Sequence, residues 1–295
     1  MSSTTLDLLT GADFRFGLTV GLIALLVVIA ASLVTSSRVP LLAGGLSLPI
    51  VLTIVLDPPS TVTLGIAALV LAGALFPQTR RYPMLPALAA VPGAMFIASA
   101  FDGIPPSWTR LYVVAVIALV SPLAGSLTNR YSGQAWGPAL VGISAVGVFA
   151  AVPDTERALL AVAALFPLAF LSWPVPLASL SPAGAYGSVG ALVYIISADG
   201  LARPEVLLGL VAVFGVLVAE PLARLLAKTL PFGGLASGWR AIAIVGGFHL
   251  VMAAAAARWA AQQSSATSAL GTATFVVIAG AFVVYLSQPK SRSIS

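Results

Sequence analysis

The sequence predicts an all-α, polytopic integral membrane protein with about eleven transmembrane helices. Three observations lead to this prediction: the composition, a series of apolar runs, and the distribution of charge between those runs. Of the 295 residues, 59% are hydrophobic and 8% are charged, whereas about a quarter of the residues of a soluble domain are charged. A chain this apolar is typical of proteins whose outer surface faces lipid.

The apolar runs have the length of membrane-spanning helices. A bilayer core of about 30 Å needs roughly 20 helical residues, and about 17 are tolerated. The eleven spans predicted on this rule are 17–35, 41–56, 61–77, 84–101, 111–127, 136–152, 158–173, 179–198, 205–223, 240–258 and 267–287. Spans 41–56 and 179–198 are the weakest. We therefore expect one transmembrane domain over residues 1–295, with a short extracytoplasmic tail at 1–16 and a cytoplasmic tail at 288–295.

The charges alternate in sign from gap to gap. One alternate set of gaps holds nine Lys or Arg and a single acid, Glu220, and sums to +8. The other set holds five Arg and eight acids and sums to −3, which recovers the formal net charge of +5. Because short basic loops stay on the cytoplasmic side, this asymmetry predicts a plasma-membrane protein with its N-terminus outside and its C-terminus in the cytoplasm.

The predicted spans also repeat. After one lone N-terminal helix, five hairpins follow, at 41–77, 84–127, 136–173, 179–223 and 240–287. Pro77, Pro122, Pro167 and Pro221 stand near the predicted cytoplasmic end of the second helix in four of these units, spaced 45, 45 and 54 residues apart. A regular period implies one duplicated supersecondary unit, and these units would be parallel copies. The alternative is chance matching among helices rich in Ala, Leu and Pro.

Several function classes are excluded or disfavoured by composition. The chain has no Cys and one His, which excludes disulfides, thiolate metal sites and a multi-histidine site within one chain. No phosphate-binding loop, His-Glu-x-x-His or Asp-rich pair occurs. The pI of about 10.0 is explained by basic loops that face anionic lipid headgroups. We therefore predict no catalytic residues, metal, cofactor or nucleic-acid partner.

His249, Glu220 and Arg224 are the ionisable candidates for a functional site. His249 lies roughly 13 Å beyond Arg240 along a helix, near the bilayer midplane, and histidine titrates near physiological pH. An ionisable group at that depth is a functional candidate by default, although a neutral His bonded to a neighbouring helix is the alternative. Glu220 precedes Arg224 by four residues, the favourable order for a helical ion pair. The pair is interpreted either as a coupling gate or as a structural contact at a helix end.

The span 179–198 supplies the polar candidates. Tyr186, Ser188 and Tyr194 offer hydroxyl groups to a cavity, while the small residues among them permit close approach of neighbouring helices. Cavity lining and helix packing are therefore both open interpretations. Arg110, in an external gap, has two interpretations as well: part of an anion-attracting mouth or a solvated interfacial anchor.

The leading functional hypothesis is a multi-pass membrane transporter or channel for a small solute or ion, with proton coupling as an option. Two alternatives remain. The first is a membrane-embedded enzyme that acts on a lipid or isoprenoid, with Glu220, Arg224 and His249 as its polar residues. The second is a non-catalytic subunit of a membrane complex. The expected partners are the lipid bilayer, an unidentified solute or ion, and further copies of this chain or other subunits.

Overall fold

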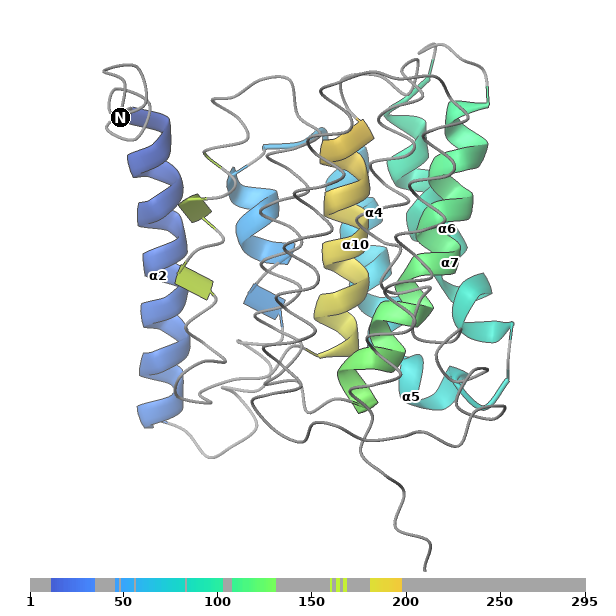
Figure 1. Cartoon of the computed structure of the whole chain (residues 1–295), viewed down its shortest axis with the longest axis horizontal. Coiled ribbons are helices and arrows are strands. Elements are labelled where there is room, and N and C mark those ends of the chain that lie inside the picture. Colours follow the sequence, from blue (N-terminus) through green and yellow to red (C-terminus); the bar gives the residue numbers. More distant parts are fainter. Residues whose placement is uncertain are drawn as a thin grey trace, which may run out of the picture.

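The computed structural model describes residues 12–34, 46–47, 49–55, 57–82, 84–102, 108–130, 160, 163–164, 167–168 and 181–197. Its helices are α2 (Ala12–Val34), α4 (Ser60–Ala74), α5 (Phe76–Thr79), α6 (Leu85–Ser99), α7 (Thr109–Arg130) and α10 (Pro182–Ser197) (Figure 1). Shorter helical pieces include residues 49–55. No strand occurs among the residues that the structure describes, so the all-α prediction is confirmed for this part of the chain.

The order of elements follows local sequence signals. Ser181 precedes α10 and accepts a hydrogen bond from the Gly184 N–H at 3.1 Å, and Pro182 occupies the first helical position. This combination of a hydroxyl N-cap and a proline in the first turn is a favoured helix start. Pro77 likewise lies in the first turn of α5. The predicted span 61–77 is therefore divided between α4 and α5 at Leu75.

Helices α4, α6, α7 and α10 form one packed unit. Helix α10 packs chiefly against α4 and α7 and more lightly against α6, and Figure 1 shows it in the middle of the assembly with α2 at one edge. Gly73, near the end of α4, lies so close to the start of α10 that a Cβ would be 2.5 Å from the Pro182 carbonyl oxygen. The end of α4 thus meets the start of α10, and these two helices are antiparallel.

The contact between α4 and α6 depends on a pair of glycines. A Cβ on Gly65 would lie 2.7 Å from the carbonyl oxygen of Gly93, and a Cβ on Gly93 would lie 2.8 Å from that of Gly65. Only hydrogen fits on either side. Such small-residue contacts let two backbones approach closely, as they do in membrane helix pairs.

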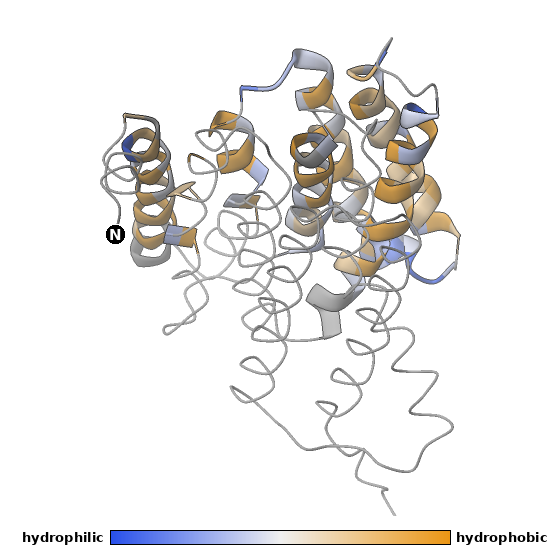
Figure 2. Ribbon diagram, turned by 45° about the horizontal axis from the view of Figure 1, so that its top comes forward, coloured by the Kyte–Doolittle hydropathy of each residue, from blue (hydrophilic) through white to orange (hydrophobic). Residues whose placement is uncertain are grey.

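Apolar side chains cover the outside of these helices as well as the core. The exposed large hydrophobic residues include Leu22, Ile23, Leu26 and Val27 on α2, Leu64 and Leu71 on α4, Leu88, Met95 and Phe96 on α6, and Leu111 and Leu119 on α7. Figure 2 shows hydrophobic colour along the helices and hydrophilic colour mainly in the connecting turns. Exposed apolar faces of this kind suit an apolar environment or a covering partner.

The described charges gather at the two ends of the helices. Asp57 precedes α4, and Asp102 and Arg110 join α6 to α7, whereas Arg80 and Arg81 lie in the turn between α5 and α6. Helices α4 and α6 are antiparallel, since Gly65 lies beside Ile97 and Gly93 beside Leu69. The acids therefore lie at one end of the unit, and the two basic residues without an acidic neighbour lie at the other. This separation agrees with the alternation of charge along the sequence.

Helix lengths differ from the predicted spans by a few residues. Helix α2 begins at Ala12 rather than residue 17, so residues 12–16 of the predicted tail are helical. Of the described helices, α7 is the one long and apolar enough to cross a membrane by itself, through Thr109–Ser126. The helical stretches Phe14–Ala30, Ser60–Ala74 and Leu85–Ser99 are apolar but shorter. The number of spans therefore stays a prediction.

Candidate functional site on helix α10

Helix α10 is buried on all its sides. Residues 184–193 are all buried, and Ala191, Leu192 and Val193, which point about 100° apart around the helix, each have 0% exposure. A helix that is apolar and buried all round occupies the centre of its protein. Tyr186 and Ser188 consequently lie in the interior, and Tyr194 is half-buried.

Tyr186 is enclosed by aromatic and glycine neighbours. Its ring lies 5.9 Å from that of Phe76, measured between centroids, at an interplanar angle of 59°. On another side, a Cβ on Gly125 of α7 would lie 2.7 Å from the Tyr186 Cε2, so the glycine makes room for the ring. The hydroxyl of Tyr186 has no hydrogen-bond partner in the described part of the structure.

Ser188 and Tyr194 have packing explanations. The Ser188 hydroxyl donates to the Gly184 carbonyl of its own helix at 2.6 Å, the usual way in which a serine is satisfied inside a helix. The Tyr194 ring meets Phe101 edge-on, with centroids 6.0 Å apart. The contact between Tyr194 and Phe101 packs the C-terminal half of α10 against the end of α6.

The glycines of α10 also serve packing. A Cβ on Gly187 would lie 2.7 Å from Cγ2 of Val70. A Cβ on Gly190 would collide with the Leu69 side chain and approach Cδ1 of Ile97 to 2.9 Å. Side chains of α4 and α6 therefore pack directly against these two glycines of α10, where a larger residue would not fit. The packing interpretation describes these glycines well.

Four buried hydroxyl groups lack any hydrogen-bond partner among the described residues: those of Thr109, Ser121, Tyr186 and Ser197. Each belongs to a residue with at most 1% exposure. Leaving a buried polar group unsatisfied costs about 1–3 kcal/mol, so each calls for an explanation such as a bound water or ion. The other hydroxyls with a described bond, such as that of Ser126 to the Leu123 carbonyl at 2.8 Å, are satisfied within their own helix.

Of these four residues, Tyr186 is a candidate predicted from the sequence, whereas Thr109, Ser121 and Ser197 are not. The one signal for Ser121 is the proline that follows it. Pro122 lies inside α7 and has no N–H, which removes the helical hydrogen bond to the carbonyl four residues earlier. The sequence Ser121–Pro122 within a helix therefore indicates a nearby backbone carbonyl that lacks its helical hydrogen bond.

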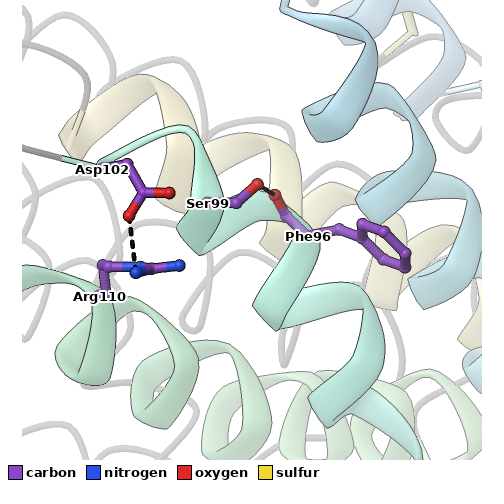
Figure 3. A network of polar contacts seen from close by, with 4 residues as sticks. All are labelled: Phe96, Ser99, Asp102 and Arg110. Carbon is purple, nitrogen blue, oxygen red and sulfur yellow. Dashed lines mark hydrogen bonds and ion pairs between the residues drawn. The ribbon is translucent and has the colours of Figure 1, made fainter.

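The ionic contact at the junction of α6 and α7 lies on the surface. Arg110 Nη1 and Asp102 Oδ1 are 2.6 Å apart, with side chains 53% and 62% exposed (Figure 3). The nearby Ser99 hydroxyl donates to the Phe96 carbonyl at 2.7 Å. An exposed pair of this kind stabilises by about 0–1 kcal/mol. Because Asp102 balances its charge, Arg110 fits the interfacial-anchor interpretation better than the anion-mouth interpretation.

The ionisable candidates His249, Glu220 and Arg224 lie outside the described residues, so the coupling interpretation of these three stays a prediction. Comparisons of the chain with protein-family models, curated proteins and solved structures found no match.

Proposed function

We propose that this chain is a multi-pass membrane transporter or channel that moves a small solute or ion through its helical interior. One observation carries the proposal: unpartnered hydroxyl groups lie inside a helical unit whose outer surface is apolar. In a protein folded in water the opposite arrangement is usual, because polar groups gain hydration at the surface. Polar side chains within membrane helices typically face the bundle interior or a water-filled cavity.

The membrane part of the proposal has support from the outer surface and from the positions of charge. The exposed leucines and isoleucines of α2, α4, α6 and α7 would meet hydrocarbon, and the described charges would meet the two headgroup layers. Helices α4 and α6 have 15 residues each, about 22 Å at 1.5 Å per residue. Adjoining turns and local thinning of the bilayer would make up the remaining length.

The hairpin repeat belongs to the same proposal. Helices α6 and α7 pack against each other, and the Arg110–Asp102 pair ties together the end of one and the start of the other. Both features agree with a hairpin over 84–127 that turns at an acidic gap. The other four hairpins, and the total of eleven spans, extend this pattern to the rest of the chain.

The direct test is flux through the purified chain. The protein, reconstituted alone in liposomes, should carry at least one small solute or ion faster than protein-free vesicles do. Turnover of a lipid substrate in detergent, with no flux, would instead favour the enzyme. Absence of flux together with stoichiometric co-purifying proteins would favour the subunit of a membrane complex.

The proposed orientation can be tested in intact cells. The chain has no Cys, so Ser60→Cys, at the exposed start of α4, and Ser293→Cys can be introduced one at a time. An impermeant thiol reagent should label the first variant and spare the second. Labelling of Ser293→Cys alone would reverse the orientation.

Proton coupling can be tested by substituting His249 and Glu220. If they form a proton path, His249→Ala should abolish the pH dependence of flux while the yield of folded protein is preserved. Glu220→Gln keeps the size of the side chain and removes its charge, so it should impair coupling more than assembly. Lower thermal stability of both variants, with unchanged transport per folded molecule, would assign both residues a structural role.

A further inference from the structure

The four unpartnered hydroxyls are confined to two helices that touch each other. Thr109 and Ser121 belong to α7, and Tyr186 and Ser197 belong to α10. Their positions cover most of the thickness of the unit. Thr109 and Ser121 are about 18 Å apart along α7, and Tyr186 and Ser197 about 16 Å apart along α10, at 1.5 Å per residue.

Three of the hydroxyls, those of Ser121, Tyr186 and Ser197, lie on facing stripes of α7 and α10, whereas Thr109 points about 120° away from Ser121 around α7. Tyr186 and Ser197 are eleven residues apart in α10, which is about three helical turns and brings them to the same face. The Tyr186 ring contacts α7 at Gly125. Ser121 lies one turn before Gly125 on α7, and positions four residues apart share a face. Ser121 is therefore on the same stripe of α7 as the Gly125–Tyr186 contact, and it is buried.

A backbone carbonyl adds a second polar group close to Ser121. Pro122 lacks an N–H, so the carbonyl of Ala118 loses the donor that an uninterrupted helix would provide. A hydroxyl without a partner and a carbonyl that has lost its helical donor therefore occur within one turn of α7. In membrane proteins such freed carbonyls are tolerated where water or another polar group reaches them.

The interface carries no charge among the described residues. The described charged side chains Arg15, Asp57, Arg80, Arg81, Asp102 and Arg110 are all exposed. A dehydrated ion needs a ring of oxygen ligands or an opposite charge to replace its hydration shell. Isolated hydroxyls both donate and accept hydrogen bonds, which suits water and small molecules bearing hydroxyl or amide groups.

We propose that the α7–α10 interface is the transport path of this protein and that it takes small uncharged hydrogen-bonding molecules. The hydroxyls of Ser121, Tyr186 and Ser197 are successive binding positions along it. This inference rests on the proposed function and adds the substrate class and the location of the path. Water and solute share the same sites, since each hydroxyl can bond to either.

The test uses the full chain in liposomes, with osmotic swelling followed by light scattering. Glycerol and urea are the uncharged probes, and K⁺, Cl⁻ and H⁺ gradients read by dyes are the ionic probes. Wild type should raise glycerol or urea permeation above that of empty vesicles and leave ion leakage unchanged. Ser121→Ala and Tyr186→Phe should each lower that permeation about fivefold or more, the effect of one lost hydrogen bond in the path.

Two matched variants serve as controls. Ser126→Ala removes a serine hydroxyl from the same helix, but one that is bonded to Leu123. Tyr82→Phe removes a phenol that is 64% exposed. Both should permeate uncharged probes at the wild-type rate. All rates are expressed per folded molecule, measured by size-exclusion chromatography before reconstitution.

The outcomes separate this inference from the proposed function. Suppose that Ser121→Ala and Tyr186→Phe leave the permeation of uncharged probes unchanged and raise the midpoint of unfolding. The hydroxyls would then belong to a dry, packed interface, and the proposed path would be wrong. Flux of ions alone would overturn the substrate class and retain a transport function. No flux of any probe would overturn both proposals.

Discussion

Helices α2 and α10 are both apolar through their central turns, but they occupy opposite environments. Helix α2 exposes Leu22, Ile23, Leu26 and Val27 to between 43% and 61%. Helix α10 is buried around its whole circumference. Hydrophobicity alone does not separate the two helices, so another property must decide which becomes central.

The distribution of small residues distinguishes them. On α2 the contacts with Leu160 and Ala164 are made at Gly17 and Gly21, where a Cβ would collide with a carbonyl oxygen of the neighbouring segment. These two positions share one face. On α10, glycines at 187 and 190 receive side chains from α4 and α6, and Tyr186 meets α7. A helix that accommodates neighbouring helices on more than one side is packed from more than one side, because close contact between apolar helices depends on steric fit.

The largest effect is expected from enlarging α10. Gly190→Leu places four extra carbon atoms where Leu69 and Ile97 already fill the space. Extra methylene groups in a filled core typically cost about 1–3 kcal/mol, and four of them against two side chains should exceed that range. We expect loss of most monodisperse protein in detergent, measured by fluorescence-detected size-exclusion chromatography. The matched change on α2, Leu26→Ala, should leave the elution profile unchanged, since Leu26 is 61% exposed. Equal losses would remove the contrast between the two helices.

A charged residue on the exposed face of α2 tests whether that face lies against lipid or water. Leu26→Lys should destabilise the protein by about 2.5–3.5 kcal/mol if the face meets the bilayer centre, the cost of a lysine at that depth. In water the same exposed position would tolerate lysine within about 0.5 kcal/mol. Comparing unfolding midpoints in lipid nanodiscs measures the difference. A midpoint equal to that of Leu26→Ala would contradict the lipid-facing assignment.

An intermediate effect is expected where α2 touches the rest of the protein. Gly21→Ala adds a methyl group against the Ala164 carbonyl, and we expect destabilisation of about 1–2 kcal/mol from the forced displacement. Because the contact involves one face of an edge helix, α2 should become accessible to protease before the α4–α6–α7–α10 unit unfolds. Simultaneous cleavage throughout the chain would show that α2 is as integral as α10.

The smallest effect is expected at the surface ion pair. Asp102→Asn removes the partner of Arg110, and exposure of both side chains limits the loss to under about 1 kcal/mol. The loss should shrink further at high salt, because exposed charges are screened. Thermal unfolding at two ionic strengths measures both effects. A loss of several kcal/mol would show that the junction of α6 and α7 matters more than the buried contacts of α10.

Most of the helix positions in the described part were predictable from local signals. The span 84–101 corresponds to α6 at Leu85–Ser99, and the span 179–198 corresponds to α10 at Pro182–Ser197. Prolines, acidic gaps and apolar runs determine these boundaries, since each acts through neighbouring residues in the chain. Pro77 and Pro122 show the limit of that logic: the first opens a new helix, whereas the second lies inside a continuous one.

By itself the sequence determined the helical class, the approximate helix boundaries and the separation of charge between the helix ends. The tertiary structure alone decided that α10 is central and that Gly125 accommodates the Tyr186 ring. It also decided that Ser121 of α7 and Ser197 of α10 are buried and that their hydroxyls have no hydrogen-bond partner. The physical reason lies in the uniform composition. When nearly every face of every helix is apolar, no hydrophobic stripe indicates which face is inside, and close steric contact between residues distant in the chain makes the choice.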